Sequence, residues 1–249
     1  MNTLEGRVAL VTGGSKGIGR AISRSLAEAG ASVAVNYASD EEAAKRTVAE
    51  IQDSGGRAMT ARADKSHAEE VRRMFAEVNE AFGVVDIVVD NAAVYTFQPF
   101  EDITETEFRR QFDINVLGSI LVAQEYLRQV SPDGGSIISI LTAGISTNYP
   151  RSALYTSTKS ALMTLTRVLA KEVADRKIRV NAIAPGATDT EGARAVRQSG
   201  GSVDARLVAA IPLGRRGTPE DIAPVAVFLA SDDAKWITGD VIYASGGQY

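Results

Sequence analysis

The sequence predicts an α/β protein in which one doubly wound domain, residues 1–249, carries a seven-stranded parallel sheet flanked by helices. Two observations lead to this fold class. Short, continuous apolar runs rich in β-branched residues alternate with longer segments of helical periodicity. The apolar runs lack polar alternation, as expected of strands buried on both faces of a parallel sheet. With 249 residues, 45% of them hydrophobic, the chain is long enough for one sizeable core and does not require a second domain.

Composition excludes several classes of function. The formal net charge is −4 with both signs interspersed, so there is no basic stripe for nucleic acid. Cysteine is absent and His67 is the only histidine, which argues against disulfides, thiolate nucleophiles and clustered-histidine metal sites. No apolar run approaches the roughly 20 residues of a membrane span, and no signal peptide is evident. We therefore expect a soluble cytoplasmic protein with no metal, nucleic-acid or membrane partner.

The first strand, residues 7–12, runs directly into a glycine-rich turn and an amphipathic helix over residues 20–29. Gly13, Gly17 and Gly19 lack a Cβ, so the backbone can approach a pyrophosphate while the helix N-terminus offers free N–H groups. Three residues instead of one separate the first two glycines, which departs from the usual dinucleotide fingerprint. Ser15, Lys16 and Ile18 complete the turn as candidate cofactor contacts.

A helix predicted from residue 152 onward carries Tyr155 and Lys159 one turn apart on the same face. A lysine ammonium beside a phenol favours the phenolate, so we expect the pKa of Tyr155 to be lowered toward neutrality. Tyr155 is then a candidate general acid and base, with Lys159 tuning it. By itself the pair also fits a packed ring beside a solvated amine.

The two motifs together resemble those of the short-chain dehydrogenase/reductase family, over essentially the whole chain and with most similarity to 3-oxoacyl-[acyl-carrier-protein] reductase and glucose dehydrogenase-like members. The cofactor loop is Thr12-Gly13-Gly14-Ser15-Lys16-Gly17-Ile18-Gly19, and the active-site motif is Tyr155-Thr156-Ser157-Thr158-Lys159. The resemblance implies a Rossmann-type fold and an NADP(H)- or NAD(H)-dependent oxidoreductase that moves hydride between the nicotinamide and a carbonyl or secondary alcohol. It also implies that Tyr155 exchanges the proton and that Lys159 stabilises the phenolate and binds the nicotinamide ribose.

The second strand, residues 32–37, ends where the adenosine ribose is expected to bind. Tyr37 occupies the position at which NAD-preferring relatives carry aspartate, and the first carboxylate is Asp40. Lys16 lies on the same side. Hydroxyls, an amide and a lysine without a carboxylate predict NADP(H) as the preferred cofactor, and NAD(H) stays possible. Lys16 as a solvated loop residue is the open alternative. Asn36, Ala38 and Ser39 are the other candidate contacts here.

A helix over residues 41–54, a strand over 57–64, a helix over 67–82 and a strand over 84–90 follow. By resemblance Asp64, next to Lys65, lies against the adenine. The segment after the fourth strand departs from the family's usual Asn-Asn-Ala-Gly in having Asp90 and Ala93, although Asn91 and Ala92 are kept.

Thr104 and Glu107 form a capping-box pattern at the start of a long helical segment, residues 104–130. Within it, the resemblance assigns to Asn115 a water that links Lys159 to solvent. At the end of the fifth strand, residues 135–142, it places the substrate-orienting hydroxyl on Thr142, where relatives have serine, with Ser139 as the fallback. Threonine keeps the hydroxyl but adds a methyl group, so a tighter or reoriented carbonyl pocket is expected.

The sixth strand, residues 177–184, leads into residues that the resemblance places at the nicotinamide: Pro185, Gly186, Thr188 and Thr190. Residues 190–216 lack sheet-like periodicity and are predicted to form a substrate lid. A helix over 218–230 and a strand over 237–243 complete the chain. By resemblance, helices 104–130 and 152–174 and the last strand join copies into a homotetramer or dimer.

The function predicted is that of an NADP(H)-dependent ketone reductase, for a 3-oxoacyl or other carbonyl substrate. A sugar or polyol dehydrogenase is one alternative, and a non-catalytic NADP(H)-binding sensor or scaffold is the other. The substrate, its stereochemistry and the preferred direction do not follow from the sequence.

Overall fold

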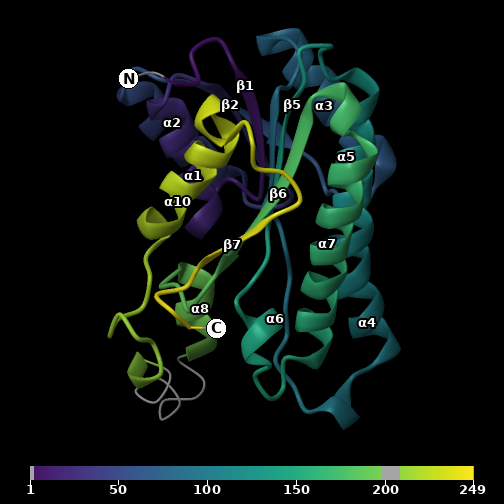
Figure 1. The fold of residues 1–249 in the computed structure, drawn as a ribbon, viewed down its shortest axis with the longest axis vertical. Helices are drawn as coiled ribbons and strands as arrows, with labels where there is room; N and C mark the ends of the chain where they lie inside the picture. The colour runs from purple at the N-terminus through teal and green to yellow at the C-terminus, as the bar shows by residue number, and fades with distance from the viewer. Residues whose placement is uncertain (1–2, 198–207, 249) are drawn as a thin grey trace.

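The computed structural model of the chain describes residues 3–197 and 208–248. In this part of the chain, seven parallel strands form one sheet in the order β3-β2-β1-β4-β5-β6-β7 (Figure 1). The strands are β1 (Val8–Thr12), β2 (Ser32–Tyr37), β3 (Arg57–Arg62), β4 (Ile87–Asp90), β5 (Gly135–Ile140), β6 (Ile178–Pro185) and β7 (Val241–Ala244). The predicted fold class is therefore confirmed.

The strand order reverses between β1 and β4, which lie side by side at the centre of the sheet. Thr12 at the end of β1 is paired in register with Asp90 at the end of β4, and Asp90 in turn with Ser139 of β5. Ligands of open α/β sheets bind in the crevice outside the carboxyl ends of the strands at such a switch point. The residues that follow Thr12 and Asp90 therefore lie where a cofactor is expected.

Helices cover both faces of the sheet. On one face α1 (Gly17–Glu28), α2 (Glu41–Asp53) and α10 (Pro219–Ala230) pack over β1 and its neighbours (Figure 1). On the other lie α3 (Ala68–Phe82), α5 (Gly118–Gln129) and α7 (Ala153–Glu172). Successive residues of β1 alternate between the two cores: Ala9 and Val11 face the α1 side, whereas Val8 and Leu10 face the α5 side. This double burial explains the unbroken apolar runs in the sequence.

The segment predicted as one helix over residues 104–130 is interrupted. Helix α4 (Glu105–Phe112) begins as predicted, with the N–H of Glu107 donating to Thr104 Oγ1 at 3.2 Å. A π-helical turn, Asp113–Leu117, then separates α4 from α5 and contains Asn115. Such turns are inserted where the regular hydrogen-bond ladder is broken, often at functional sites. The periodicity of the sequence did not reveal this turn, because an apolar pattern averaged over a long segment does not record a local change in the hydrogen-bond ladder.

Several shorter elements complete the described chain: η1 (Phe100–Asp102), α6 (Gly144–Thr147), η3 (Ala174–Arg176), α8 (Glu191–Arg197) and η4 (Asp232–Ala234). The last strand begins at Val241, four residues later than predicted. The predicted lid, residues 190–216, is helical at its start, and its residues 198–207 lie outside the described part of the chain. None of the helices described has the length and apolar character needed to cross a membrane.

Candidate active site

The glycine-rich turn between β1 and α1 has a backbone that glycine makes possible. Gly13 and Gly17 have φ values of +60° and +50°. A Cβ on Gly19 would lie 2.2 Å from the carbonyl oxygen of Gly13, so α1 can start this close to the turn only with glycine there. No side chain caps α1, which leaves N–H groups of its first turn available. The glycines let the backbone of the turn approach a ligand closely, and the uncapped N-terminus of α1 offers N–H groups. Both features fit the pyrophosphate of a dinucleotide.

Two asparagines predicted to contact the cofactor hold the turn in place. The amide of Asn91 donates to the carbonyl oxygens of Thr12 and Gly13, at 3.0 and 3.1 Å. Asn36 is buried and accepts from the N–H of Gly13 at 3.2 Å, while its own amide donates to the third strand and the residue after it. Thr12 Oγ1 accepts from the N–H groups of Asn91 and Ala92. The side chains of Asn36 and Asn91 therefore brace the turn.

At the end of β2, Ala38 and Ser39 are exposed, whereas the ring of Tyr37 packs in the core. Lys16, which is exposed, forms an ion pair with Asp40. Asp40 also caps α2 by accepting from the N–H of Ala43 at 3.0 Å. The lysine beside it and this N–H hold the pKa of Asp40 below its usual value. Asp40, the first carboxylate after β2, is thus already paired with Lys16, the cation predicted to bind a 2′-phosphate.

Asp64, predicted at the adenine, and the neighbouring cofactor candidate Lys65 both have other partners. Asp64 Oδ1 accepts from both the N–H and the hydroxyl of Ser66, so it shapes its own loop. Lys65 is buried, and its ammonium donates to Asp90 Oδ1 at 2.7 Å and to Ser119 Oγ at 3.2 Å. The charge of Lys65 therefore lies inside the protein, below the floor of the cleft. Of the two side chains, only that of Asp64 is partly exposed.

Tyr155 and Lys159 lie on α7, but the expected effect of one on the other is wrong for this structure. Lys159 is buried and donates to the carbonyl oxygen of Ile140 at 2.7 Å, with its Nζ 5.8 Å from the centroid of the Tyr155 ring. Burial raises the pKa of Tyr155, and neighbouring Tyr95 adds to the effect. Burial lowers the pKa of Lys159 to about 7, assisted by Lys65 and opposed by Asp90. Desolvation outweighs the single charge pair.

An aromatic wall stands beside Tyr155. The ring centroids of Tyr95 and Phe97 lie 5.4 and 6.1 Å from that of Tyr155, and 5.4 Å from each other. Tyr95 is half-buried, whereas Phe97 is 42% exposed. Sequence reasoning missed both residues. Their signal was available, because two aromatic side chains follow shortly after the cofactor candidates Asn91 and Ala92 in a segment without strand or helix pattern.

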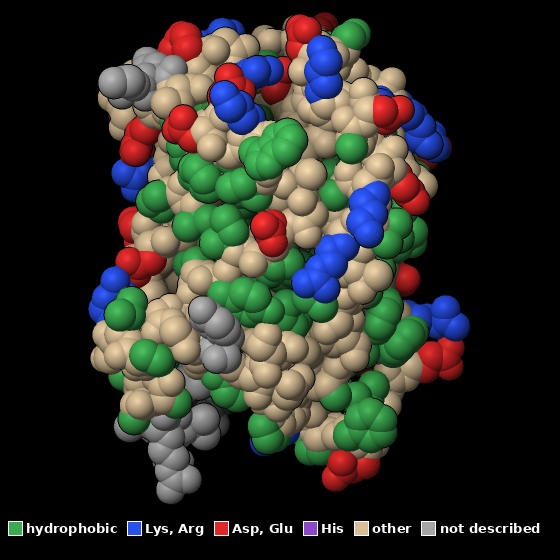
Figure 2. All heavy atoms as spheres, in the orientation of Figure 1, with side chains coloured by type: hydrophobic (Ala, Val, Ile, Leu, Met, Phe, Trp, Pro, Cys, Tyr) green, Lys and Arg blue, Asp and Glu red, His purple; other side chains and the backbone are tan. Residues whose placement is uncertain are grey.

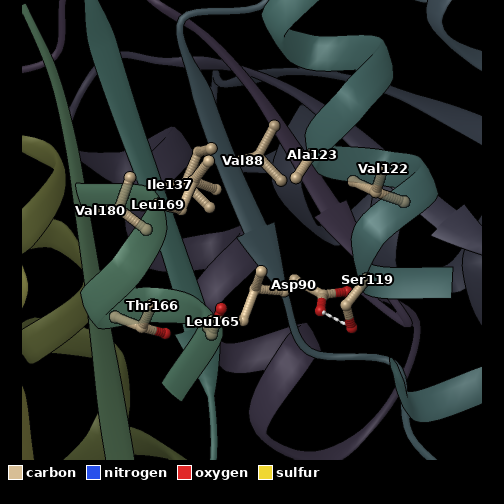
Figure 3. Close-up of a pocket in the computed structure, with 11 residues that line it drawn as sticks. Val88, Asp90, Ser119, Val122, Ala123, Ile137, Leu165, Thr166, Leu169 and Val180 are labelled. Atoms are coloured by element: carbon tan, nitrogen blue, oxygen red, sulfur yellow. Dashed lines mark hydrogen bonds between the residues drawn. The ribbon is translucent and has the colours of Figure 1, made fainter. Parts of the chain in front are cut away.

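Thr142 lies just beyond β5, where its Oγ1 accepts from the N–H of Gly144 at 3.1 Å. It is half-buried, and Thr156 of α7 also approaches Gly144, which places Thr142 against the Tyr155 helix. No hydrogen bond joins Thr142 to the hydroxyl of Tyr155 among the described contacts. Ser139, the fallback hydroxyl, lines an internal cavity of about 20 Å³ together with Asp90 (Figure 3). Thr142 is therefore the better placed of the two hydroxyls.

Asn115 connects two parts of the site. Its side chain accepts from the N–H of Val94 at 2.9 Å and donates to the carbonyl oxygen of Val94 at 2.8 Å. It also donates to Thr158 Oγ1 at 3.1 Å, and that hydroxyl donates to the carbonyl oxygen of Tyr155. Asn115 thus positions both the segment of the aromatic wall and the helix of Tyr155.

The loop after β6 closes the remaining side. The Thr190 side chain lies 3.3 Å from where a Cβ of Gly17 would be, so this loop meets the glycine turn. The hydroxyl of Tyr95 lies 3.2 Å from the corresponding position at Gly192 of α8. Ala93, Pro185 and Gly186 lie half-buried or buried at the ends of β4 and β6, and Thr188 Oγ1 donates to the carbonyl oxygen of Gly186.

Gln248 holds this loop from behind and was not foreseen. It is buried, its Oε1 accepts from the N–H of Ala187 at 2.9 Å, and its amide donates to the hydroxyl of Tyr149. A lone glutamine near the end of a chain carries no sequence signal, so only the tertiary structure could show that it contributes to the site.

A doubly wound sheet with a bare glycine turn at its switch point, and a tyrosine and a buried lysine on a neighbouring helix, defines a dinucleotide-dependent oxidoreductase. The chain belongs to the short-chain dehydrogenase/reductase family. A family model described as enoyl-(acyl carrier protein) reductase matches residues 13–248. The chain is an enzyme of this dehydrogenase/reductase class.

Individual proteins and solved structures similar to this chain support the family assignment. An uncharacterized oxidoreductase of Methylorubrum extorquens is 48% identical, over 99% of each chain. Tetrahydroxynaphthalene reductase of Pyricularia oryzae is 40% identical, over 98% of this chain and 90% of its own. A blue fluorescent protein from a metagenomic library, solved in complex with NADPH, superposes with a TM-score of 0.91 at 34% identity, with 99% of each chain covered.

Proposed function

We propose that the protein is an NADP(H)-dependent reductase that converts a ketone into a secondary alcohol. The observation that carries this proposal is the position of Tyr155, whose raised pKa keeps the phenol protonated at neutral pH, directly beside an aromatic wall open to solvent at Phe97. A protonated phenol is the form that a proton donor needs. The same group could act as a base for alcohol oxidation only at alkaline pH.

The residues present fit a dinucleotide. The bare backbone of Gly13 to Gly19 and the uncapped α1 would hold the pyrophosphate, and the segment after β6 would hold the nicotinamide end. We propose NADP(H) over NAD(H), because Lys16 and the exposed Ser39 lie at the end of β2 and the single carboxylate there, Asp40, is neutralised by Lys16. The solved NADPH complex of a related protein supports the same choice. When bound, the cofactor supplies the hydride.

The side chains of the protein would supply the proton for the reduction. Tyr155 donates its proton to the carbonyl oxygen of the substrate as the carbonyl carbon accepts hydride, which gives the alcohol and leaves a phenolate. Lys159, in its ammonium form, stabilises that phenolate from within the protein. Thr142 offers a hydroxyl to orient the carbonyl oxygen, and Asn115 keeps the helix of Tyr155 and the segment of Val94 in register. Solvent then returns the proton to Tyr155.

The aromatic wall favours one group of ketones. Tyr95 and Phe97 offer ring faces and edges beside the proposed proton donor. Such rings pack against flat apolar groups with offset or edge-to-face geometry. We propose a ketone with an aromatic or conjugated group next to its carbonyl, rather than a 3-oxoacyl chain. The name of one relative, tetrahydroxynaphthalene reductase, points to the same chemistry. A sugar or polyol would leave this apolar wall poorly used.

We also propose that the protein is a homo-oligomer, a tetramer or dimer. The face that carries α10, β7 and α7 presents hydrophobic side chains with few charges near its centre (Figure 2). Val168 of α7 and Phe228 of α10 are 46% and 38% exposed. β7 is an edge strand of the sheet in the described part of the chain, and edge strands tend to pair with other chains. Sedimentation equilibrium tests this proposal, and a monomer would contradict it.

A substrate screen tests the proposed function. The oxidation of NADPH and of NADH would be followed with aromatic ketones, aliphatic ketones and 3-oxoacyl thioesters at neutral pH, and sugar oxidation at alkaline pH. We expect turnover of NADPH with aromatic ketones at the highest kcat/KM. Faster sugar oxidation would favour a polyol dehydrogenase, and tight NADPH binding without turnover of any substrate would favour a sensor.

A further inference from the structure

The most unusual feature beneath the cleft is a buried ion pair between Lys65 and Asp90. Both side chains are almost fully buried, with 3% and 4% of their surface exposed, and Lys65 Nζ lies 2.7 Å from Asp90 Oδ1. Isolated charges are not left in a protein interior, and a buried pair is tolerated only with good geometry and further hydrogen bonds. This pair has them: Thr12 Oγ1 donates to Asp90 Oδ1 at 2.9 Å, and Ser119 Oγ donates to Asp90 Oδ2.

The structure makes room for this pair. A Cβ on Gly118 would lie 2.7 Å from Cγ of Lys65 and 3.1 Å from its Cδ, so the lysine stem passes over the start of α5 where a side chain is missing. On its other side, Asp90 borders the small cavity in Figure 3, in which Asp90 and Ser119 are hydrogen bonded among apolar side chains such as Val88, Val122 and Ile137. Water has little access to either charge, so their fields act over a longer range than at the surface.

The pair touches the two halves of the site. Thr12, which donates to Asp90, also accepts from the N–H groups of Asn91 and Ala92 beneath the glycine turn. Ser119 accepts from Lys65, and its Oγ lies within hydrogen-bond distance of both Asp90 Oδ2 and the carbonyl oxygen of Asn115, the latter at 2.7 Å, so these two acceptors share its one proton. One ion pair thus joins the cofactor turn to the π-helical turn of Asn115.

We propose that Lys65 and Asp90 act as a positioning pair for the reductase, which sets the charge state of Lys159 from below and joins the cofactor turn to Asn115. The proposal rests on the proposed function, because it assigns the pair to that reaction. Neither residue touches the substrate.

The charge state of Lys159 depends on the charged groups that surround it. Lys65, from the loop after β3, disfavours the ammonium form of Lys159, and Asp90, from β4, favours it. Tyr155 faces Lys159 from the same helix. Of the other elements packed on α7, α6 has no charged residue and Asp113 of the π-helical turn is exposed. On α4 the pairs Glu107–Arg110 and Glu105–Arg109 satisfy each other. Asp175 and Arg176 of η3 are exposed and follow the C-terminal end of α7. Arg179 of β6 borders a cavity at the opposite edge of the sheet.

The test removes one charge at a time while keeping shape. Asp90→Asn leaves Lys65 unopposed, so Lys159 loses its proton at lower pH, and the fall of kcat/KM with rising pH should begin roughly one pH unit earlier. Lys65→Met leaves Asp90 unopposed and should move that fall roughly one unit to higher pH. Because Lys65 acts more strongly on Lys159 than Asp90 does, the double variant should move it upward by less than Lys65→Met alone.

A second readout is independent of turnover. Deprotonation of Lys159 also makes the unfolding free energy of the cofactor-free protein depend on pH, and the pH at which that dependence begins should move downward in Asp90→Asn and upward in Lys65→Met. If the wild type reduces no ketone, the proposed function fails, while this readout still decides the role of the pair. Shifts of both single variants in one direction would overturn the proposal. If a single variant does not fold, the double variant decides. The proposal is overturned if the transition pH of the double variant equals that of the wild type or lies below it.

Discussion

The rings of Tyr95 and Tyr155 lie with their centroids 5.4 Å apart at an interplanar angle of 53°, so the proposed proton donor is covered on one side by another phenol. Burial raises the pKa of Tyr155, and the electrostatic influence of neighbouring Tyr95 adds to this increase. The ring of Tyr95 also forms one wall of the space in which a substrate carbonyl would lie. We therefore expect the ring of Tyr95 to affect both the pKa of Tyr155 and the choice of substrate.

Tyr95→Leu should raise KM for an aromatic ketone about three- to tenfold, since an aromatic pair contributes about 0.5–1.5 kcal/mol beyond its buried area. KM for a small aliphatic ketone should change less. Trp236→Leu is the control, because this ring is 96% exposed and borders a cavity at the opposite edge of the sheet. Equal changes for both ketones would argue against the aromatic wall as a selectivity element.

Tyr155→Phe should lower kcat by roughly 100- to 10,000-fold, the range expected for a lost general acid. The affinity for NADPH, measured by the change in its fluorescence, should remain within about twofold, because the glycine turn and the loop after β6 are untouched. A phenylalanine variant with near wild-type turnover would show that another group donates the proton.

Lys16→Ala should weaken NADPH binding by about tenfold, or about 1.4 kcal/mol, and NADH binding much less. Asp40→Asn is the matched variant, because it releases Lys16 from its ion pair and should strengthen NADPH binding. Isothermal titration with both cofactors gives the ratio of the Kd for NADH to the Kd for NADPH. If the ratio is the same in wild type and Lys16→Ala, this lysine is only a solvated loop residue.

Lys159 should make the stability of the cofactor-free protein increase with pH. Its pKa falls from the ordinary 10.5 to about 7 in the folded chain, because burial disfavours the ammonium. Between these values the folded chain holds the amine neutral while the unfolded chain holds it protonated, so unfolding takes up a proton. The unfolding free energy should then rise by up to roughly 1.4 kcal/mol per pH unit from about pH 7 to 10.5.

Denaturant unfolding of wild type and Lys159→Met over this range measures the effect. The methionine variant lacks the titrating amine, so the difference in stability between the two proteins isolates it. A difference that does not change with pH would mean that Lys159 keeps its proton in the folded state.

Gln248→Ala should raise the Kd for NADPH and lower kcat/KM several-fold, because the N–H of Ala187 loses its partner and the loop after β6 is released. Gln129→Ala is the control, since this half-buried glutamine ends α5 and its amide donates to Glu125 and not to that loop. Unchanged NADPH affinity in Gln248→Ala would show that the loop is held without it.

The strands and most helices could be predicted because their signals are local. Residues 32–37 and 41–54 match β2 and α2 almost to the residue, since a doubly buried strand and an amphipathic helix each leave a distinct apolar period. The π-helical turn at Asn115 and the delayed start of β7 were missed. Both depend on packing against neighbouring elements, which a local period does not record.

The chain by itself determined which groups are available for chemistry: a bare glycine turn behind the first strand, and a tyrosine and a lysine one helical turn apart. Those properties are set by residue type and spacing. Only the tertiary structure decided their electrostatics. It buried Lys159 and covered Tyr155, which reversed the expected direction of the tyrosine's pKa, and it placed Lys65 against Asp90 instead of in the cleft. Desolvation and charge pairing depend on which distant segments meet, and the distance along the chain does not encode that.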